Sequence, residues 1–397
     1  MTKISELVSS LAVSQTLAMS QRSNELRQNG VDVINLSLGE PDFDTPKHIK
    51  EAAKRAVDDN FTHYTPVPGY LSLRKAISDN MRSEGLEYAP EQIVVANGAK
   101  QALFDAVMAV VNPGDEVIIP TPAWVSYVEI VKLARGVSVT VPTSIESDFK
   151  ITPESLEAAI TPRTRLVMFN SPSNPSGSVY TRCELQALVD VLERHPEVAI
   201  LSDEIYHHIN YTGSYASMAS FPEIKERVIV IDGVSKAYAM TGWRIGFSAS
   251  NLTLAKAITK LQGQTTSCAS SIAQKAAEAA YSGSQKCVEQ MCDAFRNRRD
   301  MIVRLFRAIP GLKVNEPQGA FYLFPEVSAY LGKMTADGQE INTSGDLAMY
   351  LLNHAHVATV DGAAFCLPGY IRLSYAASEA QIEEASKRIA AALAELS

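Results

Sequence analysis

The sequence predicts an α/β protein, with a large domain built on a mainly parallel sheet between helices and a smaller α+β domain after it. Short apolar runs rich in Val and Ile alternate with amphipathic helical stretches from about residue 90 onward. Near-continuous apolar strands separated by helices are typical of a parallel sheet that is covered on both faces. The last third of the chain departs from this alternation, because a long charged helix is followed there by short strands.

The large domain is expected to open its sheet with a strand over residues 93–96, where Ile, Val, Val and Ala form an apolar run. A glycine and an amphipathic helix over 99–111 follow, then a strand over 116–119 and a helix over 124–134. Further apolar runs predict strands at residues 137–141, 166–169, 198–201, 228–231 and 243–247.

The smaller domain is expected to open with a helix over residues 284–308, which ends before a Pro-Gly pair. After it we expect a strand over 320–324, a helix over 344–354, short strands near 357 and 371, and a closing helix from 378. The first 45 residues are too few for a domain and are expected to form an arm that packs with the small domain. The predicted division is therefore an arm over residues 1–45, a large domain over 46–283 and a small domain over 284–397.

Composition excludes several classes of protein. The 36 Lys and Arg against 44 Asp and Glu give a net charge of −8, so the chain lacks the basic excess of a general nucleic-acid binder. The longest apolar stretches, such as residues 106–111, are far shorter than the ~18 residues of a membrane span, and the N-terminus has no signal-peptide core. Five cysteines without a C-x-x-C pair indicate free thiols in a reducing cytoplasm.

Common catalytic and metal motifs are absent from the sequence. It contains no phosphate loop, no G-x-G-x-x-G, no G-x-S-x-G and no H-E-x-x-H. The pairs His207-His208 and His354-x-His356 have no Cys or carboxylate framework at ligand spacing. We therefore interpret them as structural histidines and predict no metal site.

Polar residues gather at the ends of the expected strands, where an open α/β sheet places its ligand groups. Gly98, Ala99 and Lys100 follow the first strand at a helix start, where free N–H groups suit a phosphate, although such a turn is usually only a turn. A loop with two prolines and a glycine places Asn174 after the strand over 166–169. Asp203 ends the next strand, and as a buried acid it needs a cationic or hydrogen-bonding partner.

The most informative segment surrounds Lys236. This lysine follows an apolar strand, with Ser235 beside it and Arg244 eight residues later, in a mostly uncharged setting. A lysine among apolar neighbours has a depressed pKa and can act as an amine nucleophile or base. Ser235 and Arg244 add hydrogen-bond donors suited to a phosphate. A surface lysine is the usual alternative, but it would not need these neighbours.

Four strings together resemble one known family. They are NSPSNPSG at residues 170–177, SDEIY at 202–206, VSKAYAMTGWRIG at 234–246 and GYIRLSY at 369–375. In this order they resemble the class I aminotransferases, which are pyridoxal-phosphate enzymes of fold type I, and within them the bacterial-type aspartate aminotransferases. The resemblance covers almost the whole chain and implies a seven-stranded sheet in the large domain.

The resemblance implies a complete site for pyridoxal 5′-phosphate. Lys236 would form the Schiff base and move the substrate proton, and Asp203 would pair with the pyridinium nitrogen, which makes the ring an electron sink. The other implied contacts are Asn174 and Tyr206 to the phenolic oxygen, Trp124 stacked on the ring, Ala99, Lys100, Ser235 and Arg244 at the phosphate, and Tyr64 at the phosphate from a neighbouring subunit. A homodimer with a shared active site is therefore expected.

The resemblance also implies the substrate contacts. Arg372 would hold the α-carboxylate of an amino acid or 2-oxo acid with its planar fork, helped by Gly39, Trp124 and Asn174. Lys100, Ser14 and Thr16 match groups around the distal carboxylate of acidic substrates. Without the family match, Gly39 would be a turn glycine, and Ser14 and Thr16 would be polar residues of an arm.

The predicted function is a ping-pong transfer of an amino group, with aspartate and 2-oxoglutarate as the preferred pair. Asp361 stands where the family often has proline, and an acid facing the pocket there would weaken acidic substrates. An aminotransferase for aromatic, prephenate or branched substrates and a β-lyase of the same fold remain alternatives. A cofactor-binding regulator is a distant one, because the chain carries no basic helix-turn-helix extension.

Overall fold

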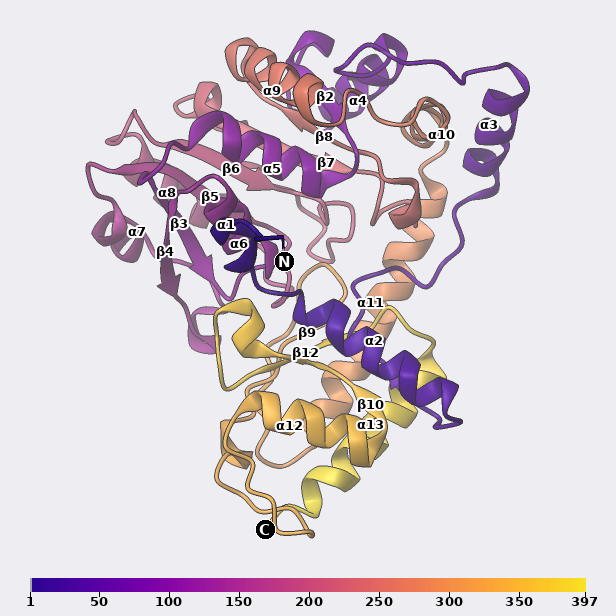
Figure 1. Ribbon diagram of the computed structural model, residues 1–397, viewed down its shortest axis with the longest axis vertical. Helices are drawn as coiled ribbons and strands as arrows, with labels where there is room; N and C mark the ends of the chain where they lie inside the picture. The colour runs from indigo at the N-terminus through magenta and orange to yellow at the C-terminus, as the bar shows by residue number, and fades with distance from the viewer. Residues whose placement is uncertain (1) are drawn as a thin grey trace.

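The computed structural model describes residues 2–397, and its largest element is a seven-stranded sheet (Figure 1). The sheet runs in the order β2 (Ile93–Ala96), β8 (Gly246–Ala249), β7 (Val228–Gly233), β6 (Ala199–Asp203), β5 (Thr164–Asn170), β3 (Glu116–Thr121) and β4 (Val137–Pro142). In this sheet β8 runs in the opposite direction to the other six strands. The predicted α/β class with a mainly parallel sheet is therefore confirmed.

Helices cover both faces of the sheet, because alternate residues of each strand point to opposite sides. Val94 and Val117 pack with α5, α6 and α9 on one face, whereas Ile93 and Ile118 pack with α3, α4, α7, α8 and α10 on the other. The helices are α3 (Lys47–Asp58), α4 (Leu71–Ser83), α5 (Ala99–Val110), α6 (Ser126–Leu133), α7 (Pro153–Ala159), α8 (Arg182–Leu192), α9 (Leu252–Thr265) and α10 (Ser271–Ser282). Two apolar layers thus enclose strands that are buried on both sides.

The C-terminal residues form a second core around Phe295, Tyr322 and Leu373. Its antiparallel sheet has the order β11 (Val360–Asp361), β12 (Ile371–Ser374) and β9 (Tyr322–Leu323). Three helices surround it, namely α11 (Lys286–Arg307), α12 (Ser344–Tyr350) and α13 (Glu379–Ala394). Figure 1 shows the long α11 running from beside α10 of the large domain into this core.

The N-terminal segment contacts both cores. It contains α1 (Glu6–Ser9), α2 (Gln15–Gln28) and β1 (Ile34–Asn35), and β1 pairs in parallel with β10 (Val357–Ala358). Closer to the N-terminus, Lys132 of α6 donates to the Ser10 carbonyl, and Glu129 of α6 accepts from the Ala12 N–H at 3.2 Å. Residues 14–17 therefore lie where the two cores meet.

One strand prediction was wrong in position. The run over residues 243–247 suggested a strand, but Thr241–Trp243 forms a 3-10 turn, and β8 begins only at Gly246. Arg244 between them adopts a left-handed φ of +57°, which brings its guanidinium over Gly98. Hydrophobicity alone does not mark this turn, because Trp243 and Ile245 are as apolar as Phe247 of the strand that follows.

No helix within residues 2–397 is long and apolar enough to cross a membrane.

Asp105, on the inner face of α5, is 0% exposed, and neither of its carboxylate oxygens has a hydrogen-bond partner. Burial raises the pKa of Asp105 to about 7. The pKa of an aspartate in an unfolded chain is lower, about 3.9. The free energy of unfolding therefore falls as pH rises from about 3.9 to about 7, because the buried Asp105 resists ionisation. We expect Asp105→Asn to raise the free energy of unfolding by about 1–3 kcal/mol at about pH 8 and to have no effect near pH 3.5.

Urea unfolding at the two pH values measures this difference. The exposed Asp190 offers a matched control, because Asp190→Asn removes a carboxylate that is already solvated. An equal increase in the free energy of unfolding for Asp105→Asn at both pH values would contradict the expected effect of Asp105 ionisation.

Candidate active site

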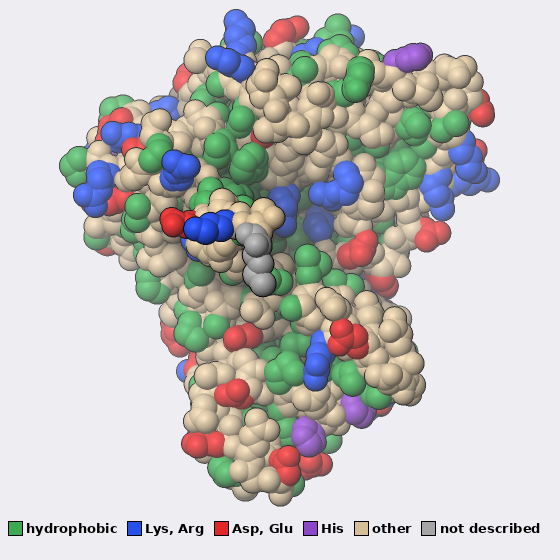
Figure 2. All heavy atoms as spheres, in the orientation of Figure 1, with side chains coloured by type: hydrophobic (Ala, Val, Ile, Leu, Met, Phe, Trp, Pro, Cys, Tyr) green, Lys and Arg blue, Asp and Glu red, His purple; other side chains and the backbone are tan. Residues whose placement is uncertain are grey.

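A cavity of about 460 Å³ lies where the carboxyl ends of the large sheet, the N-terminal segment and the second core meet. Figure 2 shows a hollow between the two parts of the molecule, with basic side chains inside it. Of the residues predicted for the site, all but Tyr64 line this one cavity: Ser14, Thr16, Gly39, Ala99, Lys100, Trp124, Asn174, Asp203, Tyr206, Ser235, Lys236, Arg244 and Arg372. Tyr64 lies outside it and is 91% exposed.

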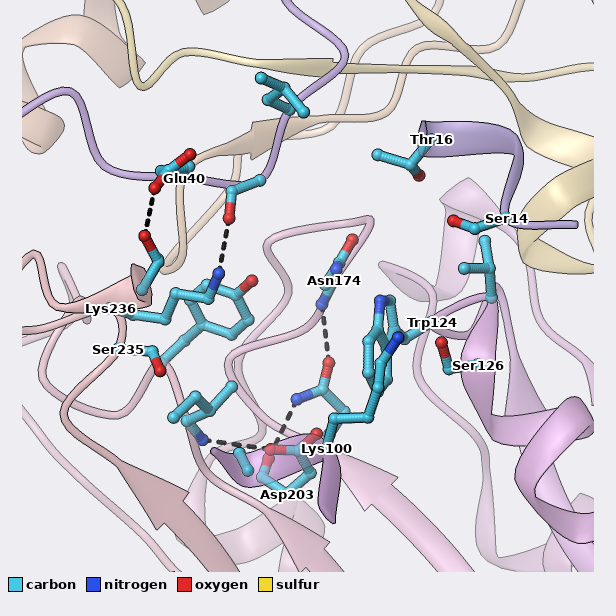
Figure 3. A pocket seen from close by; sticks show the side chains of 18 of the residues that line it. Ser14, Thr16, Glu40, Lys100, Trp124, Ser126, Asn174, Asp203, Ser235 and Lys236 are labelled. Carbon is cyan, nitrogen blue, oxygen red and sulfur yellow. Dashed lines mark hydrogen bonds between the residues drawn. The ribbon is translucent and has the colours of Figure 1, made fainter. Parts of the chain in front are cut away.

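Lys236 lies in the loop after β7, and its side chain enters the cavity (Figure 3). Its Nζ donates to the Gly39 carbonyl at 2.5 Å and lies 5.7 Å from the centre of the Tyr206 ring. Burial lowers the pKa of Lys236 to about 8; the Glu40 carboxylate opposes this effect, while Arg372 and Arg244 act in the same direction as burial. The amine therefore becomes neutral at lower pH than an exposed lysine does, and a nucleophile or base must be neutral.

Asp203 ends β6 on the cavity floor and is 4% exposed. Its Oδ2 accepts a hydrogen bond from the Tyr127 hydroxyl at 2.6 Å, and its Oδ1 accepts from the Ile205 N–H at 3.3 Å. Burial raises the pKa of Asp203 to about 6, although the hydrogen bond from Tyr127 opposes that rise. The carboxylate is thus held in place and is ready to pair with a cationic ring.

Another part of the cavity is suited to an anion such as phosphate. Gly98 begins α5 with φ +84°, and the first N–H groups of a helix have no partner within it. The Arg244 guanidinium lies over this turn, because a Cβ on Gly98 would be 2.4 Å from its Nη2. A Cβ on Gly246 would likewise be 2.2 Å from the Ala99 nitrogen. A side chain at either glycine would therefore prevent Arg244 and β8 from lying this close to the start of α5.

Arg372, on β12, is 2% exposed and has no acidic partner within residues 2–397. Its Nη1 donates to Asn174 Oδ1 at 3.0 Å and its Nη2 to the Ser37 carbonyl at 2.5 Å, while its buried Nε has no partner. The guanidinium lies between the rings of Tyr322 and Phe365, with centres at 4.7 and 4.9 Å. A buried arginine without an acid is a strong site for a carboxylate ligand.

Lys100 is a further cation of the cavity. Its Nζ lies 4.8 Å from the centre of the Trp124 ring and forms no ion pair with any acid of residues 2–397. Burial lowers the pKa of Lys100, and Arg244 adds to this effect. Figure 3 shows Ser14 and Thr16 at the start of α2, on the side of the cavity where Trp124 and Ser126 lie. The Ser14 side chain makes no capping hydrogen bond to α2, so its hydroxyl is available to a ligand.

The structure adds residues that the sequence did not indicate. The Tyr322 and Tyr206 hydroxyls lie 2.6 Å apart, and Tyr127 bonds Asp203 from within α6. Asn170 donates to the Asp203 carbonyl at 3.0 Å and accepts from the Asn174 N–H at 2.7 Å, so it ties two site residues together. Only Asn170, the last residue of β5, carried a signal, because it begins the N-S-P-S-N-P-S-G loop.

Asp361 does not line the cavity. Its Oδ1 accepts hydrogen bonds from the Ser344 hydroxyl at 2.6 Å and from the Ala363 N–H at 3.1 Å. The acid therefore caps the turn that follows β11 and does not face an incoming carboxylate.

The comparisons with known proteins agree with this geometry. The family model for aminotransferase class I and II matches residues 31–389. The chain belongs to this family. The aminotransferase is 48% identical to the aspartate aminotransferase of Rhizobium meliloti (strain 1021), over 98% of this chain and 96% of that protein. It is 47% identical to the aspartate/prephenate aminotransferase of Cereibacter sphaeroides, over 99% of both chains.

Solved structures give the same result. The crystal structure of an aspartate aminotransferase from Rhizobium meliloti superposes on this aminotransferase with a TM-score of 0.97, 47% identity and full coverage of both chains. An aspartate aminotransferase from Thermus thermophilus with maleate superposes with a TM-score of 0.92 at 40% identity, over 99% of this chain and 100% of that one. The predicted fold type and enzyme class are therefore confirmed.

Proposed function

We propose that this aminotransferase uses pyridoxal 5′-phosphate to move an amino group between L-aspartate and 2-oxoglutarate in a ping-pong reaction. One observation carries the proposal: three cations without an acidic partner in the described residues, Arg244, Lys100 and Arg372, line the same cavity as Lys236. The cofactor and a dicarboxylic substrate together bring three anionic groups, namely one phosphate and two carboxylates. Each anion can therefore have its own cation.

The residues present fit the cofactor. The turn at Gly98 with Arg244 and Ser235 would hold the phosphate, and Asp203 would pair with the ring nitrogen. Trp124 would cover the ring, while Asn174 and Tyr206 would bond its phenolic oxygen. When bound, pyridoxal phosphate supplies an electron sink for the negative charge that develops at the substrate Cα.

The chain's own residues then bind and orient the substrate and move its proton. Arg372 holds the α-carboxylate with two parallel N–H groups, which fixes the position of the Cα. Lys236 takes the Cα proton on its neutral Nζ and then gives it up again. Its pKa of about 8 allows both protonation states near neutral pH. Asp203 remains ionised above about pH 6 and so keeps its partner protonated.

Lys100, Ser14 and Thr16 would bind the distal carboxylate. Two observations support an acidic substrate: Lys100 has no acidic partner in residues 2–397, and the Thermus thermophilus relative was solved with maleate, which is a dicarboxylate. Prephenate also carries two carboxylates, and the Cereibacter sphaeroides relative is named for it. Prephenate is therefore the second candidate substrate of the same site.

An absorption spectrum tests the proposal directly. The protein loaded with pyridoxal phosphate is mixed with L-aspartate alone, without any oxo acid. We expect the visible band of the bound cofactor to move to shorter wavelength, with about one oxaloacetate released per chain. A band that aspartate leaves unchanged would remove the substrate assignment, and release of pyruvate and ammonia from a β-substituted amino acid would favour a lyase.

Lys100→Met is expected to lower kcat/KM for aspartate by about 10–10²-fold, because one hydrogen-bonded ion pair to the distal carboxylate is lost. Alanine has no distal carboxylate, so its kcat/KM should change by less than about threefold. Steady-state kinetics with both donors measure the ratio. The exposed Lys260 supplies a control variant, Lys260→Met. An equal loss for both donors would assign Lys100 to the cofactor phosphate alone.

Tyr127→Phe is expected to weaken binding of the cofactor at low pH. The variant removes the hydrogen bond that opposes the raised pKa of Asp203, so this pKa rises further above about 6. Protonated Asp203 cannot pair with a cationic ring, and the pH at which cofactor affinity falls should move up by about one unit. Titrations of cofactor binding from acid to neutral pH measure the midpoint, with Tyr70→Phe as the control. An unchanged midpoint would mean that Tyr127 has no influence on Asp203.

A homodimer is proposed as the working assembly, with residues 1–45 as the arm, 46–283 as the large domain and 284–397 as the small one. The exposure of Tyr64 supports the dimer, because a tyrosine that is 91% exposed is available to the phosphate site of a second chain. We place the enzyme in the cytoplasm, since its five cysteines are all free thiols. Sedimentation velocity of the loaded enzyme tests the dimer.

A further inference from the structure

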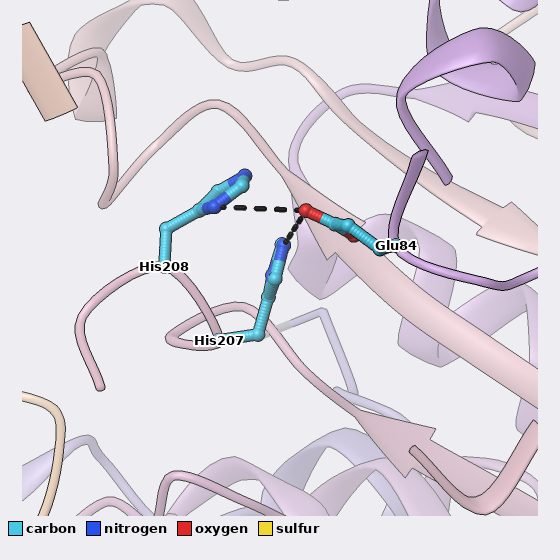
Figure 4. A group of neighbouring side chains, drawn as sticks. All are labelled: Glu84, His207 and His208. Atoms are coloured by element: carbon cyan, nitrogen blue, oxygen red, sulfur yellow. Dashed lines mark hydrogen bonds and ion pairs between the residues drawn. The ribbon is translucent and has the colours of Figure 1, made fainter. Parts of the chain in front are cut away.

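A second group of chemically active side chains lies outside the cavity. Glu84 caps the C-terminal end of α4, and His207 and His208 follow β6 in the turn after Tyr206 (Figure 4). Glu84 Oε1 lies 3.2 Å from His207 Nε2 and 3.8 Å from His208 Nδ1, and the three ligand atoms lie within 4.8 Å of one another. Sequence spacing could not reveal this group, because more than 120 residues separate the acid from the histidines.

The surroundings orient His207 toward Glu84. His207 Nδ1 lies 3.0 Å from the Glu204 carbonyl and 3.4 Å from Asp232 Oδ2, so Nε2 points to the other side of the ring. Metal-binding histidines characteristically give their second nitrogen to a carbonyl or carboxylate in this way. The ring of His208 lies against that of His207, with centres 3.7 Å apart and planes tilted by 39°, and its buried Nε2 has no partner.

The charge around the group is also unbalanced. Two carboxylates, those of Glu84 and Asp232, lie within 3.4 Å of the ring nitrogens of His207. Within residues 2–397 no Lys or Arg forms an ion pair with either of them, and only the imidazoles of His207 and His208 do so. One imidazolium shared by two carboxylates offsets only one of their charges, and a bound divalent cation would neutralise more of the negative charge.

We propose that Glu84, His207 and His208 bind a divalent transition-metal cation of the Zn²⁺ class. Two imidazoles and one carboxylate are typical zinc ligands, and in a tetrahedral site with bonds of about 2.0–2.1 Å the ligand atoms lie about 3.3 Å apart. The 3.2 Å contact already meets this spacing, whereas the 3.8 Å contact and the widest separation, within 4.8 Å, must shorten by rotation of the side chains. A water molecule takes the fourth position, and the proton shared by His207 and Glu84 leaves to solvent.

The cation would connect the end of α4 to the turn after β6. That turn follows directly on Asp203 and Tyr206, but none of the three ligands lines the cavity. The site is therefore separate from the cavity, and metal binding to it can be measured without assaying activity.

Equilibrium dialysis of the loaded enzyme against micromolar Zn²⁺, with metal counted by mass spectrometry, tests the site. We expect about one Zn²⁺ per wild-type chain in competition with a weak chelator. Glu84→Gln and His208→Gln should each weaken binding by about tenfold or more. Asp232→Asn, which removes a carboxylate behind His207, should weaken it by about 10–100-fold.

Glu87→Gln is the matched control, because Glu87 is exposed and only three residues from Glu84, and it should bind Zn²⁺ like the wild type. The far-ultraviolet circular dichroism of each variant shows that it is folded, and the two ligand variants give independent tests if one is unstable. Absence of stoichiometric Zn²⁺ in the wild type would overturn the proposal. Equal binding by wild type, Glu84→Gln and His208→Gln would overturn it as well, since the metal would then lie at another site.

Discussion

Lys236→Ala is expected to lower kcat for the reaction of aspartate with 2-oxoglutarate by about 10⁴-fold, the largest effect of any substitution in this enzyme. The lysine lies in the cavity with its Nζ 2.5 Å from the Gly39 carbonyl, and burial lowers its pKa to about 8. Within the described cavity lining, Lys100 is the only other amine, and its Nζ lies beside Trp124. No other side chain there can therefore replace the lost nucleophile and base.

Two further variants separate chemistry from folding and charge. Lys236→Arg keeps a positive charge but cannot supply a neutral amine, so its kcat should be as low as that of Lys236→Ala. Lys260→Ala, on the exposed side of α9, should keep wild-type kcat. Single-turnover kinetics with aspartate measure the proton-transfer step itself. A Lys236→Ala variant with more than a few percent of wild-type kcat would exclude the assigned role.

The fold of the large domain could be predicted largely because its strands are buried on both faces. The runs at residues 93–96, 166–169 and 228–231 are apolar throughout, and they lie within β2, β5 and β7. The prediction was wrong where an apolar sequence makes a turn, as at Thr241–Trp243. It was also wrong in extent for β9, which is only Tyr322–Leu323, because Ala320 has a φ of +54° that a strand cannot contain.

The candidate site could be predicted where its residues stand in continuous strings. Asn174, Asp203 and Lys236 each follow a strand, and the parallel arrangement brings such strand ends to one edge of the sheet. Tyr127 and Tyr322 were missed because each lies in an ordinary helix or strand pattern, and their roles depend on distant partners. Tyr127 reaches Asp203 across 76 residues of sequence and Tyr322 reaches Tyr206 across 116. Such contacts follow from tertiary packing alone.

Arg372→Leu should have the second largest effect, a fall in kcat/KM of about 10²–10⁴-fold. Two hydrogen bonds between charged groups contribute about 1.5–3 kcal/mol each, and every 1.4 kcal/mol is tenfold. The fall should be equal for aspartate and alanine, because both carry the α-carboxylate, whereas Lys100→Met affects aspartate alone. Arg372→Lys keeps the positive charge without the planar guanidinium, so its kcat/KM should lie between those of Arg372→Leu and the wild type. Selective loss of aspartate activity in Arg372→Leu would place the distal carboxylate at Arg372 and reverse the proposed orientation of the substrate.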